Sequence, residues 1–360
     1  MRILITLILA CVLLPSASEG KTYVLAFSGM PGSPVYANRY RDWLGRFHQH
    51  LVKKAKVPAE DIICLSGDKD FKTDFLNGAS THDEVLRALA KIARSAQPED
   101  QFVLFIVGHG FIVEERIGLV LPGPDLTIDQ LADALDAIKA RNQVILNLSS
   151  IGGASIVTLA SGTRVNITGN AEMEQNEPVF AEFFLLALEG RADGLTSKPD
   201  GQVTLLEAYN WATFNVAQWV ARQSFDHKTF KVVGREAVRL FKKLYVGNGD
   251  GIGVRELSAK SNANAKDAIV EIGIPPKGAS HEKGFDLGFW QFRRGLVEHA
   301  LLEDLGEEMG VYGVKTEEDR KTFIPMTGEP GKPGHRASRV VIGKSALMPA
   351  PDQVKVPAKE

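Results

Sequence analysis

Two groups of residues in the middle of the chain are of the types that enzymes use for nucleophilic catalysis. The first is His109, which stands between two glycines directly after the apolar run 102–107. The second is the pair Ser149 and Ser150, which ends an apolar run that begins at Val144. A histidine can act as a general base, and a serine hydroxyl can attack a carbonyl carbon when such a base activates it. Catalysis by these groups requires a fold that brings them together.

Two buried strands and an intervening helix would position these residues. Unbroken aliphatic runs of about six residues are typical of strands that are buried on both faces, as in a parallel sheet. Residues 102–107 and 144–149 are such runs, and a capping box at Thr127 opens a helical pattern between them. Ligands of parallel sheets bind in the crevice at the carboxyl ends of the strands. We therefore expect His109 and the serine pair to share one crevice.

Strand and helix patterns alternate from residue 21 to about residue 225. Further strand-like runs lie at 21–27, 61–65 and 164–168, and further capping boxes open helices at Thr81 and Thr204. This alternation predicts an α/β fold, a three-layer αβα sandwich around a mostly parallel sheet. We expect residues 21–245 to form this domain.

The C-terminal part of the chain has weaker patterns. Residues 246–325 are expected to form an irregular extension with little clear structure, in which only the stretch 290–305 is typical of a helix. Residues 326–360 are rich in Pro, Gly, Lys and Ser, a composition that predicts a flexible tail.

The N-terminus has the features of a secretory signal peptide over residues 1–20. Arg2 supplies a positive start, residues 3–14 are nearly all apolar, and small residues follow at 15–20. The apolar run is too short to span a bilayer comfortably. We therefore predict a secreted or periplasmic protein whose mature chain has no membrane span.

Composition argues against several partners and cofactors. The net charge of −2 gives no electrostatic basis for binding nucleic acid. The glycines at 249–253 lack the preceding apolar strand of a dinucleotide site, and the histidines lack metal-ligand spacing. We expect no cofactor and no metal. Removal of the signal peptide would leave Cys64 as the only cysteine, which we interpret as a buried strand residue.

The two motifs together resemble the caspase/legumain family of cysteine peptidases, whose signature is an apolar strand with His-Gly and then an apolar strand with (Asp/Glu)-Ala-Cys-x-Ser-Gly. The resemblance covers about residues 21–225, and residues 102–110 fit the histidine half closely. It implies that His109 assists the leaving group and that the Gly110 N–H forms part of the oxyanion hole. The chain is similar to secreted bacterial-type members with Ser or Thr in place of Cys, which also carry a stretch like 299–304.

The nucleophile half departs from the family pattern, because residues 144–154 contain no Cys and no acidic residue. One alignment places Ser149 at the Cys position and another places Ser150 there. We favour Ser150, because this register keeps the spacing to the following glycine. The loss of sulfur matters, because a thiol with a pKa near 8.5 gives a thiolate far more readily than a serine hydroxyl ionises.

Three functional hypotheses follow. The first is an inactive pseudo-peptidase whose crevice binds a peptide or protein ligand, in a binding or regulatory role. The second is a working peptidase or hydrolase that uses Ser150 or Ser149 as nucleophile with His109 as base. The third is a plain α/β protein without a peptide site. A serine Oγ within about 3.2 Å of a His109 nitrogen would favour the second.

Overall fold

The computed structural model describes residues 20–171, 178–195, 198–223, 300–306 and 326–344, together with strand residues at 229–233, 255–260, 269–273, 312–313 and 322–323. The expected signal peptide lies outside the described residues, apart from residue 20. The part of the expected tail beyond residue 344 lies outside them as well.

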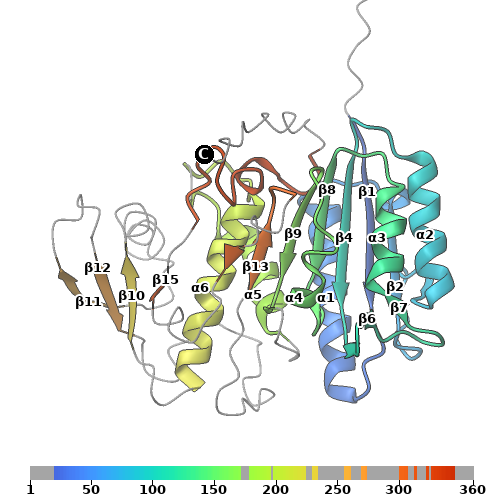
Figure 1. Ribbon diagram of the computed structural model, residues 1–360, viewed down its shortest axis with the longest axis horizontal. Coiled ribbons are helices and arrows are strands. Elements are labelled where there is room, and N and C mark those ends of the chain that lie inside the picture. The colour runs from blue at the N-terminus through green and yellow to red at the C-terminus, as the bar shows by residue number, and fades with distance from the viewer. Residues whose placement is uncertain are drawn as a thin grey trace, which may run out of the picture.

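The main sheet has eight strands in the order β14-β13-β9-β8-β4-β1-β2-β3 (Figure 1). Their bounds are β1 (Thr22–Ser28), β2 (Ile62–Ser66), β3 (Gly78–Ala79), β4 (Gln101–Val107), β8 (Asn142–Asn147), β9 (Arg164–Thr168), β13 (Leu301–Glu303) and β14 (Tyr312–Gly313). Strands β3, β2, β1, β4, β8 and β9 run parallel to one another. Strands β13 and β14 add antiparallel pairings at one edge. The prediction of a mostly parallel α/β sheet is confirmed.

Helices cover both faces of this sheet. The helical segments are α1 (Pro34–Lys53), η1 (Ala59–Asp61), α2 (His82–Ser95), α3 (Ile128–Asp136), α4 (Gly152–Ser155), α5 (Phe180–Leu186), η2 (Ala187–Arg191), α6 (Leu205–Gln223) and η5 (Ala337–Arg339). Helices α1, α5 and α6 pack in one apolar core, and α2 and α3 pack in the other. Strand β4 contributes to both, with Val103 and Phe105 in the first core and Phe102 and Leu104 in the second. Alternating residues of a strand point to opposite faces, so the sheet is the middle of three layers.

The helix starts follow the predicted capping chemistry. The Thr127 hydroxyl accepts a hydrogen bond from Gln130 N at 3.3 Å, and the Gln130 side chain accepts one from Thr127 N at 3.0 Å. Thr204 and Glu207 form the same reciprocal pair at 3.2 and 3.0 Å. Thr81 accepts from the third residue of α2. These bonds satisfy N–H groups that a helix start would otherwise leave unpaired.

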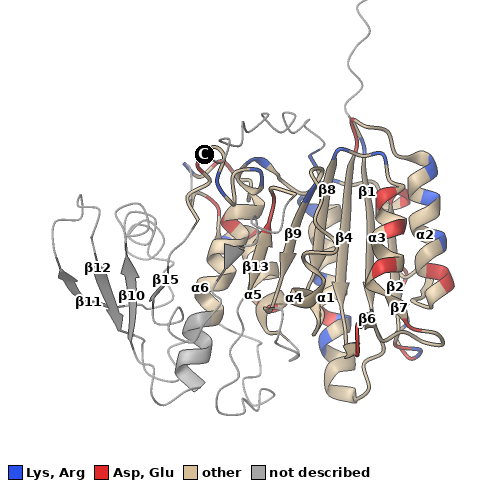
Figure 2. Ribbon diagram, in the orientation of Figure 1, with Lys and Arg blue, Asp and Glu red and all other residues tan. Residues whose placement is uncertain are grey.

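Charged residues lie mainly on helices and loops and are absent from the central strands of the sheet (Figure 2). Strands β1, β4 and β8 carry none. A strand covered on both faces by helices excludes water, and an unpaired charge there would be costly. The uncharged sequences of these three strands therefore agree with their central place in the sheet.

Two smaller sheets complete the secondary structure. Strands β5 (Gly110–Val113), β6 (Arg116–Leu119) and β7 (Leu126–Thr127) form a three-stranded sheet directly after His109. Strands β10 (Thr229–Val233), β11 (Arg255–Lys260), β12 (Ile269–Gly273) and β15 (Thr322–Phe323) form a four-stranded sheet. Strand β10 precedes the expected domain boundary at residue 245, and its partners β12 and β15 follow it, so that boundary would divide this sheet.

The C-terminal part of the chain completes the main domain, contrary to two predictions. The helix expected at 290–305 is wrong over Leu301–Glu303, which form β13 and pair with β9; residues 290–299 lie outside the described ones. The flexible tail is wrong over residues 326–344, where the following apolar side chains are buried: Met326, Ala337, Val340 and Ile342. The Asp304 carboxylate accepts hydrogen bonds from two main-chain N–H groups of this segment, each at 3.0 Å.

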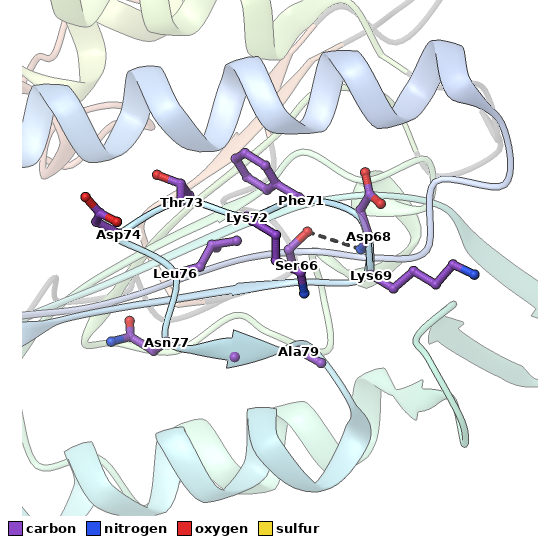
Figure 3. A pocket seen from close by; sticks show the side chains of 11 residues that line it. Ser66, Asp68, Lys69, Phe71, Lys72, Thr73, Asp74, Leu76, Asn77 and Ala79 are labelled. Carbon is purple, nitrogen blue, oxygen red and sulfur yellow. Dashed lines mark hydrogen bonds between the residues drawn. The ribbon is translucent and has the colours of Figure 1, made fainter.

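The connection between β2 and β3 surrounds a pocket of about 520 Å³ at the edge of the sheet (Figure 3). Phe71 and Leu76 line it together with Lys69, Lys72 and the main chain of β3. This pocket lies at the carboxyl end of β2, on the same edge of the sheet as the strand ends of interest.

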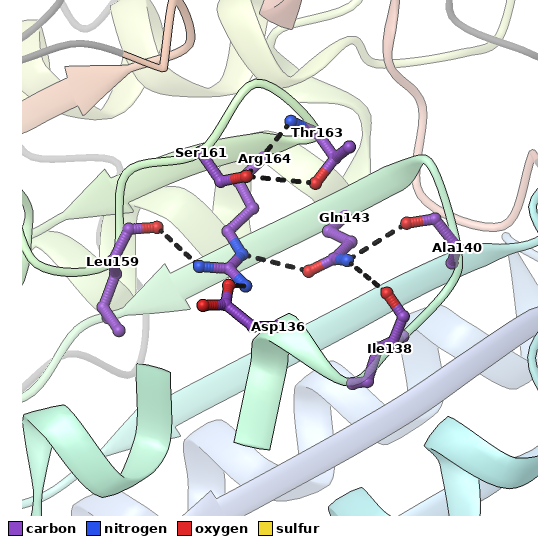
Figure 4. A network of polar contacts seen from close by, with 8 residues as sticks. All are labelled: Asp136, Ile138, Ala140, Gln143, Leu159, Ser161, Thr163 and Arg164. Atoms are coloured by element: carbon purple, nitrogen blue, oxygen red, sulfur yellow. Dashed lines mark hydrogen bonds and ion pairs between the residues drawn. The ribbon is translucent and has the colours of Figure 1, made fainter. Parts of the chain in front are cut away.

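A buried arginine joins β8, β9 and α3 at the opposite edge (Figure 4). Arg164, at the start of β9, is 2% exposed. Its guanidinium donates to the Gln143 side chain at 3.1 Å, to the Leu159 carbonyl at 3.2 Å and to the Asp136 carboxylate at 2.6 Å. The three acceptors compensate the buried positive charge of Arg164. These bonds fix the amino ends of β8 and β9.

Candidate functional site

The two predicted groups lie at neighbouring strand ends. His109 follows β4 and the serine pair follows β8, and these strands are adjacent and parallel. The expected adjacency is therefore confirmed. Two hydrogen bonds join the loops, from Gly110 N to Ser150 Oγ at 2.9 Å and from Ser150 N to the Gly108 carbonyl at 3.0 Å.

The two serines have different surroundings. The Ser149 side chain is fully buried, and its hydroxyl donates to Asn147 Oδ1 at 2.7 Å. The Asn147 amide in turn donates to Ser155 Oγ at 2.8 Å, so Ser149 belongs to a structural network. Ser150 is 4% exposed, and within the described part of the chain its hydroxyl bonds only to Gly110 N–H. Ser150 is thus the serine beside the predicted oxyanion donor.

The ring of His109 is held by the loop after β1 and by helix α1. Its Nε2 lies 3.1 Å from the Pro31 carbonyl oxygen. A carbonyl can only accept a hydrogen bond, so Nε2 carries a proton in this arrangement. The Tyr36 ring packs edge-on at 4.6 Å between centroids, and Tyr40 lies at 5.9 Å. These contacts fix the ring, and with the proton on Nε2 the ring nitrogen that can accept a proton is Nδ1.

Glycines let the strand-end loops approach one another closely. Gly108 has a φ of 144°, in the region that favours glycine. A Cβ at Gly110 would collide with the Ile151 side chain, and one at Gly152 would collide with the Asn147 carbonyl oxygen. The Gly110 contact sets the loop after β4 directly against Ile151 of the loop after β8, with Gly110 N–H at the Ser150 hydroxyl.

Asn170 is a site residue that sequence reasoning missed. It lies just after β9 and is fully buried. Its Nδ2 donates to the Ser150 carbonyl at 2.7 Å, and its Oδ1 accepts from Gly153 N at 3.1 Å. Asn170 therefore braces the serine loop from the neighbouring strand. The sequence signal for Asn170 is a polar residue just after β9, whose carboxyl end lies beside the carboxyl ends of β4 and β8.

Other residue types that could do chemistry have structural places. Cys64 is buried in β2, as predicted, and burial raises the pKa of its thiol to about 12. The thiol therefore stays protonated and is not a nucleophile. No group of three or more His, Cys, Asp or Glu residues suited to a metal ion occurs among the described residues. Within the same residues, every helix is too short or too polar to cross a membrane.

Comparison with known proteins adds no relative: no protein-family model matches the sequence, and neither does any curated protein. Function must therefore be inferred from the strand-end residues themselves.

Proposed function

We propose that this chain is a secreted caspase/legumain-like pseudo-peptidase whose strand-end crevice binds a peptide or protein segment without cleaving it. The observation that carries the proposal is the hydrogen bond from Gly110 N to Ser150 Oγ at 2.9 Å. In the resembled family this N–H would help to stabilise the oxyanion of the substrate. Here the hydroxyl at the nucleophile position occupies that donor.

The order of elements supports the family part of the proposal. His109 and Gly110 follow the buried strand β4, and the adjacent parallel strand β8 is followed by Ser150, which we favour for the position of the family's Cys. Helices on both faces of the sheet agree with a three-layer caspase-like sandwich. Fold alone does not establish activity, which depends on the chemistry of the site residues.

The chemistry of the site supports inactivity. A serine needs a base in direct hydrogen-bond contact, and usually a third group that orients the base. His109 Nε2 donates to the Pro31 carbonyl, while the Ser150 hydroxyl accepts from a backbone N–H. A thiolate could form near a protonated histidine without such contact, but a serine alkoxide could not. The alternative, a Ser150 hydrolase with His109 as base, requires the Ser150 hydroxyl to donate to a ring nitrogen of His109.

Restoring sulfur tests whether the crevice retains the family geometry. In Ser150→Cys, a nearby imidazolium should lower the thiol pKa, and a drop of one unit from 8.5 raises the thiolate fraction at neutral pH about eight-fold. The pH midpoint of alkylation by iodoacetamide measures this pKa independently of access. His109→Ala in the same background should raise the midpoint, because the cation that favours the thiolate is then absent. Ser149→Cys is the register control, and its buried thiol should alkylate slowly with a raised midpoint.

Peptide binding and turnover are tested in the same proteins. Blocked peptides with Asn, Asp or Arg before the scissile bond should protect the thiol of Ser150→Cys from alkylation, because they occupy the crevice. The unmodified protein should not cleave these peptides. Cleavage that disappears in Ser150→Ala would overturn the pseudo-peptidase proposal in favour of the hydrolase. An unperturbed thiol together with no protection would argue for an α/β protein without a peptide site.

Secretion is the remaining part of the proposal. It is supported by Arg2, the apolar run 3–14 and the small residues that follow. N-terminal sequencing of the protein recovered outside the cytoplasm should find a start near residue 21. An intact Met1 there would contradict cleavage.

A further inference from the structure

Strand β5, which follows His109 directly, ends the small three-stranded sheet and borders the crevice. Among the described strands it pairs only with β6. Its first residue is Gly110, whose N–H contacts the Ser150 hydroxyl at 2.9 Å. The edge of β5 that faces away from β6 therefore begins in the crevice itself.

The register of β5 and β6 shows which main-chain groups lie on that edge. Val120 N donates to the His109 carbonyl at 3.0 Å, so the carbonyl of His109 faces the β6 segment. Successive residues of an antiparallel pair alternate between groups that face the partner strand and groups that face away. Gly110 accordingly directs its N–H to Ser150 instead of β6. Two residues further on, the N–H and C=O of Ile112 point the same way as those of Gly110.

The outward groups of Ile112 suit an antiparallel peptide strand. Within the described part of the chain, no main-chain group bonds to Ile112 on this side. An antiparallel neighbour exchanges two hydrogen bonds with a residue of this kind. Such a neighbour runs from Val113 toward Gly110, so the ligand residues that precede the one in the crevice would lie along β5. If the carbonyl of the crevice residue lies at Gly110 N–H, the residue opposite Ile112 is two positions before it.

One face of β5 is apolar and accessible. Val113 is 50% exposed, and Phe111, on the same face, is partly buried. A Cβ at Gly118 would lie 2.6 Å from the Phe111 ring, so this ring crosses β6 at a residue without a side chain. Ile112 faces the other way and packs with Ile117 against the apolar core. Ligand side chains opposite Phe111 and Val113 would therefore meet apolar groups.

The charges beside this face give no preference for one sign. The exposed residues at the tip of the β5–β6 hairpin are Glu114, Glu115 and Arg116, which carry both signs. Main-chain hydrogen bonds and apolar contacts are thus the interactions that this edge offers to an extended segment.

We propose that the ligand of the His109 crevice is an extended peptide that continues as an antiparallel strand along β5. Counting the crevice residue as the first and moving toward the N-terminus, the third residue exchanges two hydrogen bonds with Ile112. The second and fourth residues are apolar and lie opposite Phe111 and Val113. The proposal rests on the proposed peptide-binding function of the crevice and adds the direction and the side-chain preference of the ligand.

The probes are blocked Asn, the blocked tetrapeptide Val-Thr-Val-Asn and the blocked reverse extension Asn-Val-Thr-Val. Their Kd values are measured by protection of Ser150→Cys from iodoacetamide. Val-Thr-Val-Asn should bind at least about ten-fold more tightly than Asn, because each hydrogen bond to Ile112 contributes about five-fold and ordering the peptide offsets part of this gain. Asn-Val-Thr-Val should gain less than two-fold over Asn.

Two N-methylated forms of Val-Thr-Val-Asn test the register. Methylation of the Thr nitrogen removes the N–H that donates to the Ile112 carbonyl, and it should weaken binding about five-fold. Methylation of the nitrogen of the following Val removes an N–H that faces away from β5, and it should change the Kd less than two-fold.

The protein side of the contact has its own readouts. Val113→Ser should weaken Val-Thr-Val-Asn about three-fold and leave the Kd of Asn unchanged, because less apolar area is buried. Val52→Ser, at an exposed valine near the end of α1, is the matched control and should leave both Kd values unchanged. In the unmodified protein labelled with ¹⁵N-isoleucine, Val-Thr-Val-Asn should slow hydrogen exchange of the Ile112 amide, and Asn should not.

The outcomes separate this proposal from the function on which it rests. Equal protection by Asn and Val-Thr-Val-Asn would overturn the strand along β5 and leave peptide binding in the crevice intact. A gain with Asn-Val-Thr-Val instead would overturn the antiparallel direction, and equal effects of the two N-methyl groups would overturn the register. Absence of protection by all three probes would refute binding in the crevice, and the strand along β5 with it.

Discussion

Asn170 provides the sharpest test of how the candidate site is held in shape. Its side-chain amide bridges the Ser150 carbonyl and the Gly153 N–H, at 2.7 and 3.1 Å. The bridge is asymmetric, because one end donates a hydrogen bond and the other accepts one. Replacing the amide by groups that lack one or both functions should therefore have separable effects on stability.

Asn170→Ala removes both functions. The Ser150 carbonyl and the Gly153 N–H then lose this partner in a buried environment. Each such group left unsatisfied costs about 1–3 kcal/mol, so for the two groups we expect a loss of about 2–6 kcal/mol in the free energy of unfolding. Alanine has no titratable side chain, so the loss of unfolding free energy in this variant should not depend on pH.

Asn170→Asp keeps the acceptor and loses the donor. A carboxylate there would face the Ser150 carbonyl oxygen in a buried site, which raises its folded pKa above the unfolded value of about 3.9. The stability of the variant should therefore be greatest below that value, where the protonated acid can donate to the carbonyl. It should fall as the pH rises through the folded pKa.

Urea denaturation at about pH 4.5 and about pH 7.5 measures these differences for the three proteins. The aspartate variant should approach the unmodified protein at the lower pH and fall to the alanine variant or below it at the higher one. Equal deficits of the two variants at both pH values would refute the donor-and-acceptor bridge. An alanine deficit under about 0.5 kcal/mol would show that the serine loop does not depend on Asn170.

Three further predictions concern packing and titration. Gly152→Ala should lower the free energy of unfolding by several kcal/mol or prevent folding, because its Cβ would collide with a main-chain oxygen. The control is Gly162→Ala, whose Cβ would have no atom within 4 Å and which should cost less than about 0.5 kcal/mol in urea denaturation. Burial raises the pKa of Glu303, so its carboxyl favours folding most below the unfolded pKa of about 4.3 and less as the pH rises. Glu303→Gln should therefore flatten the decline in the free energy of unfolding between about pH 4 and pH 7. The same slope of unfolding free energy against pH in both proteins would contradict this. Burial lowers the pKa of His50 to about 4, so an NMR titration should find this ring neutral at pH 6, and a midpoint near 6.5 would refute its burial.

The parts of the fold that local sequence encodes were predictable. The helix α1 face with Tyr40, Trp43 and Phe47 repeats at helical spacing, and all three side chains are buried. The buried strands β4 and β8 are built around the apolar runs 102–107 and 144–146. Adjacency of their carboxyl ends then followed from the usual crossover in parallel sheets.

The parts that depend on distant partners were not predictable. Leu301–Glu303 has two leucines and two neighbouring carboxylates, a composition that also suits a helix, and only pairing with β9 makes it a strand. The segment 326–344 has few apolar residues, and its position depends on acceptors such as Asp304 that precede it by about 30 residues. The choice between Ser149 and Ser150 depended on the direction of two adjacent side chains. The Ser149 hydroxyl bonds to Asn147 and the Ser150 hydroxyl to Gly110 N–H, and sequence spacing gives no access to these directions.

Strand β13, which covers β9, and the segment 326–344 have a consequence for biosynthesis. The Asn166 side chain in β9 donates a hydrogen bond to Glu303, which follows it by 137 residues. The Gln101 side chain in β4 accepts one from Gly343 N, which follows it by 242 residues. A chain still on the ribosome, or one cut short before residue 300, would present the open edge of β9 to other chains. Unpaired edges of this kind promote aggregation, and contacts so distant in sequence form slowly. The protein should therefore reach its stable form only after synthesis is nearly complete, and C-terminal truncation should reduce its solubility.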